Sequence, residues 1–136
     1  MKKVAGILVA LAFAACGGGG GGGGSSITFN PASQNCSSPA PWTETDQLPA
    51  SLKAGDTVTS TLDGIKESSG TWPPAGATKN GDGSWTDVTT FTVAQIQQSC
   101  EMASALLPLM YPGTHTIAWL DSSGKVLAQG TYSVTK

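Results

Sequence analysis

Short stretches in which apolar and polar residues alternate recur along this chain after its first 26 residues, and a period of two predicts β-strands. The clearest is residues 57–62, where Val58 and Leu62 share one face and three threonines occupy the other. Similar runs predict strands at residues 27–30, 85–92, 114–120 and 126–135. The alternation slips between Val88 and Phe91, which predicts a bulge there. Residues 68–84 are rich in Gly, Pro, Ser and Asn, so they predict a loop with one short strand around Trp72.

A single helix is predicted after the strand at residues 85–92. Thr92 and Gln95 have the spacing of a capping box, and Phe91 and Ile96 are placed to pack together as a hydrophobic staple. Pro108 ends the predicted helix. The apolar positions fall on one face that we expect to point inward, and they are Ile96, Cys100, Ala103 and Leu107.

The first 15 residues have the pattern of an export signal. Lys2 and Lys3 precede an apolar stretch, residues 4–15, that is too short to span a bilayer. The stretch ends in Phe13-Ala14-Ala15-Cys16, which resembles the lipobox of bacterial lipoproteins. The resemblance implies that the signal is removed and that Cys16 becomes a lipidated N-terminus. Phe13 stands where the family favours leucine, so cleavage at Ala12-Phe13-Ala14 by ordinary signal peptidase stays open as the alternative.

Residues 16–26 predict a flexible tether. Eight consecutive glycines, Gly17 to Gly24, are followed by Ser25 and Ser26, and such a composition buries nothing. A lipidated cysteine followed by polyglycine resembles the stalk of surface or outer-membrane lipoproteins, which implies a lipid anchor at the outer membrane of the cell envelope. Residues 27–136 then form one small domain, because this length supports a single core.

Cys36 and Cys100 are expected to form a disulfide. An exported chain meets an oxidising compartment, and lipidation of Cys16 leaves these two cysteines as a pair. The pair would close a loop of roughly 65 residues, which contributes about 4 kcal/mol in the chain-entropy model.

Composition excludes nucleic acid as a partner. Loss of Lys2 and Lys3 with the signal leaves five lysines against nine acids, and the sequence contains no arginine. Phosphate binding therefore lacks both the charge and the bidentate donor that it normally uses. Abundant threonine and serine, with only 12% charged residues, indicate a mostly β exported domain.

The last 25 residues resemble the final two strands of bacterial immunoglobulin-like modules. The matching pattern is Pro-Gly, an alternating strand, an Asp-x-x-Gly turn, Val-Leu, Gly, an aromatic residue and Val, carried by Pro112-Gly113, Ile117, Asp121, Gly124, Val126-Leu127, Gly130, Tyr132 and Val134. This resemblance implies an immunoglobulin-like β-sandwich, here with one short helix before the last hairpin. His115 stands where the pattern usually has an aromatic residue, so the subfamily stays open.

The sequence contains few candidate residues for catalysis or metal binding. His115 is the single histidine, and we expect it to pack or to form hydrogen bonds at the start of a strand. The carboxyl pairs Glu44 with Asp46 and Asp82 with Asp87 are expected to be solvated. Asn80-Gly81-Asp82-Gly83 resembles the middle of an EF-hand loop, but threonines replace the acids at both ends. We therefore expect no cofactor, no metal site and no enzyme; a small secreted hydrolase is the alternative.

The remaining recognition groups are tryptophans. Trp119 is expected in the core, whereas Trp42, Trp72 and Trp85 lie in or beside predicted loops. Trp72 and Trp85, if exposed, would form an aromatic platform for a glycan or protein partner, bordered by Asn80, Asp82 and Asp87. The alternative is that they are lids over the ends of the sheets. The sequence thus predicts a lipid-anchored, non-catalytic binding or accessory module of the cell envelope, with a glycan-binding module as the alternative within recognition.

Overall fold

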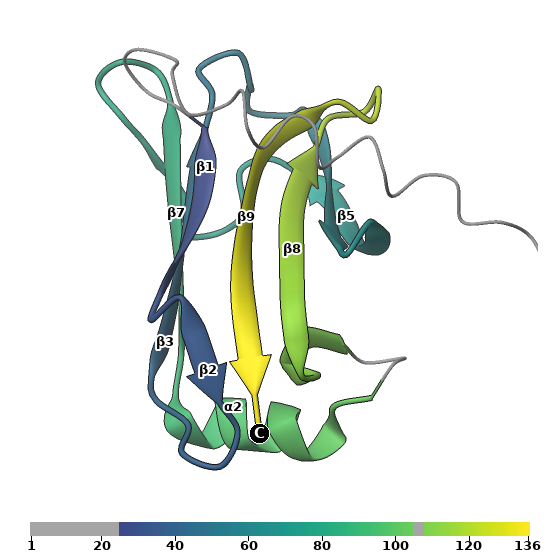
Figure 1. Cartoon of the computed structure of the whole chain (residues 1–136). Coiled ribbons are helices and arrows are strands. Elements are labelled where there is room, and N and C mark those ends of the chain that lie inside the picture. The colour runs from purple at the N-terminus through teal and green to yellow at the C-terminus, as the bar shows by residue number, and fades with distance from the viewer. Residues whose placement is uncertain (1–24, 105–107) are drawn as a thin grey trace, which may run out of the picture.

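The computed structural model describes residues 25–104 and 108–136, which fold into two facing β-sheets with one α-helix across one end (Figure 1). The strand order is β1-β3-β7-β6 in the first sheet and β2-β9-β8-β4-β5 in the second. The predictions of a mostly β fold, one helix and one disulfide are confirmed. Cys16, the predicted signal and most of the predicted tether lie outside the described residues.

The first sheet is antiparallel throughout. It contains β1 (Ser26–Asn30), β3 (Trp42–Leu48), β7 (Trp85–Phe91) and the two-residue β6 (Thr78–Lys79). The register of β3 with β7 runs without a shift along both strands, so the bulge predicted near Val88 is wrong. Strand β3 is absent from the sequence prediction.

The second sheet contains β2 (Ser33–Asn35), β4 (Thr57–Leu62), β5 (Ile65–Thr71), β8 (Gly113–Leu120) and β9 (Val126–Thr135). Only the β2–β9 pair is parallel. Strands β4, β8 and β9 confirm the predicted strands with nearly the same bounds. Most of β5 and all of β6 lie in the segment predicted to be a loop, and β5 forms an exposed edge of its sheet.

Aromatic side chains fill the space between the sheets. Phe29 stacks on Trp42 with ring centroids 5.1 Å apart, and the Tyr132 ring meets Trp42 edge-on at 4.8 Å. The other buried apolar side chains extend this cluster along the sandwich, and they include Ile27, Leu48, Leu52, Val58, Leu62, Ile96, Met110, Ile117 and Val134.

Strand β9 approaches β1 at a point that only glycine permits. A Cβ atom at Gly130 would overlap the carbonyl oxygen of Ile27 and lie 2.7 Å from its carbonyl carbon. Because the obstacle is backbone rather than a flexible side chain, the absence of a side chain at Gly130 lets the two sheets meet along this side.

The helix α2 (Val93–Met102) begins as predicted. The Gln95 amide donates to Thr92 Oγ1 at 3.3 Å, and the Thr92 amide donates to Gln95 Oε1 at 2.8 Å, which completes the capping box. The helix ends earlier than predicted, because Ala103 adopts an extended backbone well before Pro108. A short 3-10 helix (Pro108–Met110) follows, and Leu107 of the predicted helix face lies outside the described residues.

Candidate functional site

The tryptophans proposed as a binding platform are buried. Trp72 is 1% exposed and Trp85 is 7% exposed, so the prediction of exposed rings is wrong. Trp72 meets Trp85 edge-on at 5.8 Å and Trp119 at 6.0 Å, and the Trp85 indole donates to the Leu52 carbonyl at 2.9 Å. These contacts fix the rings inside the core, in agreement with the alternative reading of structural lids.

Two of the polar residues assigned to that platform belong to one turn, and the third lies on β7. Asp82 closes its own turn, where its Oδ1 accepts hydrogen bonds from the amide (2.9 Å) and hydroxyl (2.5 Å) of Ser84. Asn80 donates to Ser84 Oγ at 2.9 Å and to Thr86 Oγ1 at 3.0 Å. Asp87 lies on β7 directly opposite Asp46 of β3. Because Trp72 and Trp85 are buried, these residues have no exposed aromatic platform to border.

The Asn80–Ser84 segment is a turn with internal hydrogen bonds. The hydrogen bonds from Ser84 lower the pKa of Asp82, because they favour its carboxylate form. Among the described residues, no three His, Cys, Asp or Glu side chains are grouped in a way that could hold a metal ion.

His115 is buried and has an oxygen atom beside each ring nitrogen. Its Nδ1 lies 2.7 Å from Asp63 Oδ2, and its Nε2 lies 2.5 Å from the carbonyl oxygen of Tyr111. Each ring nitrogen therefore has a hydrogen-bond partner within the fold. The prediction that His115 packs and forms hydrogen bonds is confirmed, and neither nitrogen is left to act as a general base.

A cluster of carboxyl groups that the sequence did not identify lies on the inner face of the first sheet. Residues of β3 with even numbers point inward, and Trp42 and Leu48 at its ends are fully buried. Between them, Glu44 is half-buried and Asp46 is 4% exposed. The expectation that this pair is solvated is therefore wrong. One sequence signal could have revealed the burial of this pair. Trp42, Glu44, Asp46 and Leu48 are spaced by two, so a strand here places both acids on the same face as two large apolar residues.

Asp46 connects the two sheets. Its Oδ2 accepts a hydrogen bond of 2.7 Å from the Trp119 indole, which reaches across from β8. Its Oδ1 is buried and has no conventional donor among the described residues. Glu44 precedes Asp46 by two residues on the same face of β3, so a proton shared between the two carboxyl groups would satisfy this oxygen.

Burial controls the charge of this pair. It raises the pKa of Glu44 to about 8, and the nearby carboxylates of Asp46, Glu67 and Asp87 add to the rise. Burial also raises the pKa of Asp46, against the opposing hydrogen bonds from Trp119 and Glu44. Two adjacent carboxyl groups in a low-dielectric space do not both ionise readily, so the pair resists losing its last proton.

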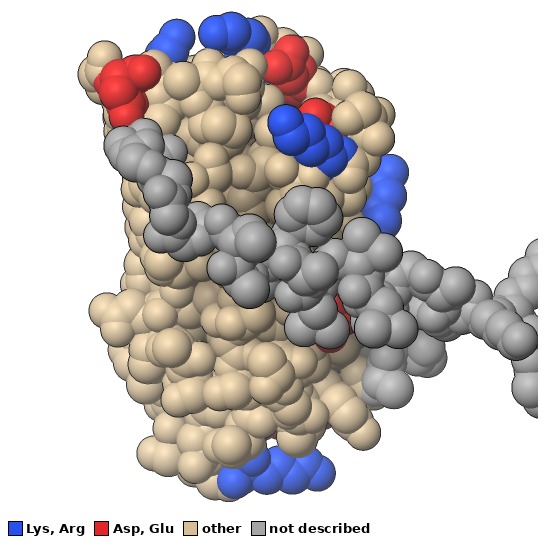
Figure 2. Space-filling model, turned by 45° about the horizontal axis from the view of Figure 1, so that its top comes forward, with Lys and Arg blue, Asp and Glu red and all other residues tan. Residues whose placement is uncertain are grey.

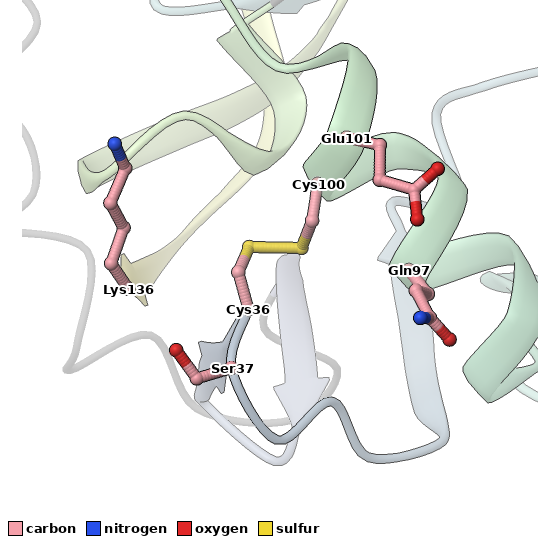
Figure 3. A pocket seen from close by; sticks show the side chains of 6 residues that line it. All are labelled: Cys36, Ser37, Gln97, Cys100, Glu101 and Lys136. Carbon is pink, nitrogen blue, oxygen red and sulfur yellow. A yellow bond between two sulfur atoms is a disulfide. The ribbon is translucent and has the colours of Figure 1, made fainter.

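The disulfide lies beside the helix, where the chain leaves β2. Cys36 follows β2 and Cys100 lies on α2, and their Cα atoms are 5.7 Å apart, which confirms the predicted bond. A pocket of about 310 Å³ lies beside the disulfide, and Figure 3 shows the side chains that line it. The pocket is lined by Cys36, Ser37, Gln97, Cys100, Glu101 and Lys136.

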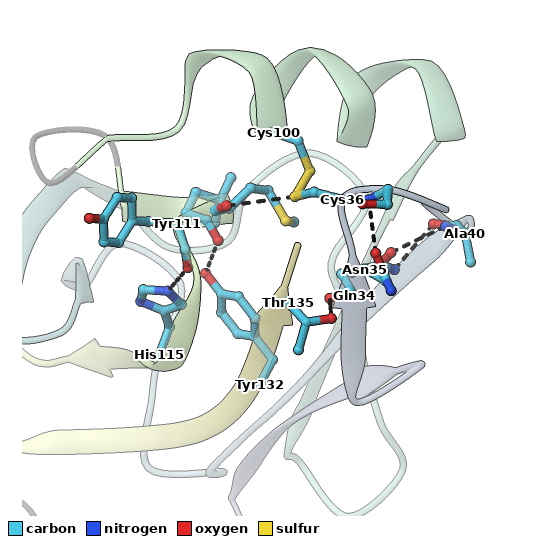
Figure 4. Close-up of a disulfide and its surroundings, with 12 residues drawn as sticks. Gln34, Asn35, Cys36, Ala40, Cys100, Tyr111, His115, Tyr132 and Thr135 are labelled. Atoms are coloured by element: carbon cyan, nitrogen blue, oxygen red, sulfur yellow. Dashed lines mark hydrogen bonds between the residues drawn. A yellow bond between two sulfur atoms is a disulfide. The ribbon is translucent and has the colours of Figure 1, made fainter.

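Backbone and side-chain hydrogen bonds hold the chain around the disulfide (Figure 4). The Gln34 amide donates to the Ala40 carbonyl at 3.1 Å and accepts from the Ala40 amide at 3.2 Å, which closes the loop that carries Cys36. The Tyr132 hydroxyl donates to the Leu109 carbonyl at 2.6 Å. These hydrogen bonds hold the segments on either side of the disulfide in place.

Charged residues are unevenly distributed on the face of the molecule that Figure 2 shows. On the face in Figure 2, the acidic and basic residues gather mainly at one end, and neutral residues cover most of the rest. None of the helices in residues 25–104 and 108–136 is long and apolar enough to cross a membrane. Comparisons of the chain with protein-family models, with curated proteins and with solved structures find no match.

Proposed function

We propose that this chain is a lipid-anchored domain of the bacterial cell envelope that serves as a non-catalytic binding or accessory module. The observation that carries the proposal is the Cys36–Cys100 disulfide, because such bonds persist in exported proteins and are rare in the cytosol. It supports the interpretation of residues 1–15 as an export signal.

Cysteine parity supports the anchor. The disulfide uses two of the three cysteines, which leaves Cys16 as the odd one, directly after the lipobox-like residues and before the polyglycine run. Lipidation would consume this thiol, and the tether would hold the folded domain away from the membrane surface.

The strand order supports an immunoglobulin-like fold. Immunoglobulin domains arrange their strands as A-B-E-D in one sheet and as C-F-G, with C′ in the variable type, in the other. The orders β1-β3-β7-β6 and β9-β8-β4-β5 correspond to these when β1 is strand A and β9 is strand G. The disulfide departs from the pattern, since it joins the end of β2 to α2 rather than strand B to strand F.

The arrangement of polar groups supports a non-catalytic role. The hydrolase alternative would use His115 beside an acid and a nucleophile, and His115 does lie beside Asp63. Its other nitrogen, however, faces the Tyr111 carbonyl instead of a hydroxyl or thiol. Because Trp72 and Trp85 are buried, they do not form an aromatic platform for a glycan. The partner that we propose is therefore an envelope protein or a glycan that binds elsewhere on the domain.

Replacing Cys16 tests the proposal. We expect the Cys16→Ser chain to move from the membrane fraction to the soluble fraction and to lose incorporation of a fatty-acid analogue, because the thiol is the site of acylation. Folding should be unaffected, since the disulfide pair is intact. A wild-type chain that takes up no label and fractionates as soluble would contradict the anchor.

A further inference from the structure

The two sheets are joined through the buried carboxyl group of Asp46, which accepts the Trp119 indole hydrogen bond from the opposite sheet at 2.7 Å. Glu44 lies two residues earlier on the same strand and face. Without a proton on Glu44, Asp46 Oδ1 is a buried acceptor with no donor beside a second negative charge.

We propose that Glu44 and Asp46 form a proton-controlled latch, which holds β3 against Trp119 of β8 while the pair shares a proton and loosens that contact when the proton leaves. The latch would couple the rigidity of the domain to the pH around it. This proposal is independent of the lipid anchor.

All the titratable groups that act on Glu44 carry, or acquire, negative charge. They are Asp46 on the same strand, Asp87 on β7 and Glu67 on β5. Asp63, which acts on Glu67, lies 2.7 Å from His115 Nδ1. No lysine is among the groups that act on Glu44, so loss of the shared proton leaves uncompensated repulsion, with Asp46 and Asp87 in the same sheet and with Glu67 in the opposite sheet.

The sign of the pH effect follows from the direction of the shift. Burial raises the pKa of Glu44 from 4.5 to about 8, so between these values the folded chain keeps a proton that the unfolded chain releases. Stability is then greatest at the acidic end of this window and falls as the pH rises through it. Raising the pH through this whole window would lower the folding equilibrium constant by at most roughly a thousandfold. The decrease is smaller than this limit because Glu44 is partly solvated.

The first test compares urea unfolding of the full chain at about pH 5 and about pH 8.5. We expect the folding equilibrium constant of the wild type to fall at least tenfold toward the higher pH. Glu44→Gln, which mimics the protonated carboxyl, should remove most of this decrease, whereas Glu101→Gln on the exposed surface of α2 should retain it. Stability that is flat or rises with pH, or a Glu44→Gln chain that keeps the full decrease, would overturn the proposal.

A second measurement on the wild type does not depend on any variant folding. The Trp119 indole N–H bonds to Asp46, whereas the Trp42 indole N–H bonds to the Pro31 carbonyl and provides an internal reference. In ¹H–¹⁵N spectra recorded across the same pH range, the Trp119 signal should shift or exchange faster with a midpoint near that of Glu44, and the Trp42 signal should stay constant. A Trp119 signal that is as insensitive as that of Trp42 would show that the pair does not act as a latch.

Discussion

At the scale of single residues, buried polar atoms decide which tryptophan contacts stabilise this domain. The indoles of Trp42, Trp85 and Trp119 each donate a hydrogen bond, to the Pro31 carbonyl, the Leu52 carbonyl and Asp46, respectively. The Trp72 side chain is 1% exposed, yet its indole N–H has no acceptor among the described residues. The contribution of Trp72 therefore comes from packing against Trp85 and Trp119, and its N–H opposes that contribution.

Substitution of Trp72 separates packing from hydrogen bonding. We expect Trp72→Ala to lower the free energy of unfolding by about 3–5 kcal/mol, because it leaves a large cavity among aromatic rings. Trp72→Phe should cost clearly less, about 1–2 kcal/mol, since it keeps a ring and removes the unpaired N–H. Urea unfolding followed by circular dichroism measures both values. Equal losses in the two variants, or no loss in either, would contradict this account.

At the scale of elements, the sequence signals succeed where local chemistry and tertiary environment agree. The α2 capping box lies entirely within Thr92 to Gln95, so the start of the helix is set locally. Strand β3 was missed because its inward positions between Trp42 and Leu48 carry acids, which breaks the apolar alternation. The β4–β5 hairpin was missed although Asp63-Gly64 is a strong two-residue turn signal; both residues have positive φ, as such turns require.

The capping box gives a test at this scale. Thr92→Ala should lower the free energy of unfolding by about 1 kcal/mol, because the Gln95 amide loses its acceptor. Thr92→Ser keeps the hydroxyl and should retain most of the stability. Thermal unfolding of the two variants beside the wild type provides the comparison, and an alanine variant as stable as the serine variant would argue against the cap.

At the scale of the whole molecule, the disulfide joins the loop after β2 to the helix that crosses one end of the sandwich (Figure 1). Cys36 follows β2, which pairs with the last strand β9, and Cys100 lies on α2 at a sequence separation of 64 residues. The bond therefore restricts a large part of the unfolded chain, and it secures the loop after β2 against the helix.

Removal of the disulfide should cost the domain a large share of its stability. We expect the Cys36→Ala/Cys100→Ala double variant to lose about 2–4 kcal/mol and to show a steeper dependence on urea, because its unfolded chain exposes more surface. Reductant should weaken the wild type by a similar amount and leave the double variant unchanged. A double variant as stable as the oxidised wild type would show that the bond is dispensable for folding.

The sequence by itself determined the features that depend on neighbouring residues. These include strands β1, β4, β7, β8 and β9, the turn from Asp121 to Gly124, the start of α2 and the pairing of the two cysteines left after the leader. The strands, the turn and the helix start follow from periodicity, turn chemistry and capping, which involve only a few neighbouring residues. The cysteine pairing follows from the number of cysteines.

Only the tertiary structure decided where polar and aromatic groups lie relative to the core. Loop-like flanks suggested exposed rings at Trp72 and Trp85, but packing between the sheets buries both. Two acids spaced by one residue suggested a solvated pair, but the strand points Glu44 and Asp46 between the sheets and provides Trp119 from β8 as a partner. The helix likewise ends before Pro108, although no breaker precedes that proline. Burial arises from contacts between residues far apart in sequence, so no local pattern specifies it.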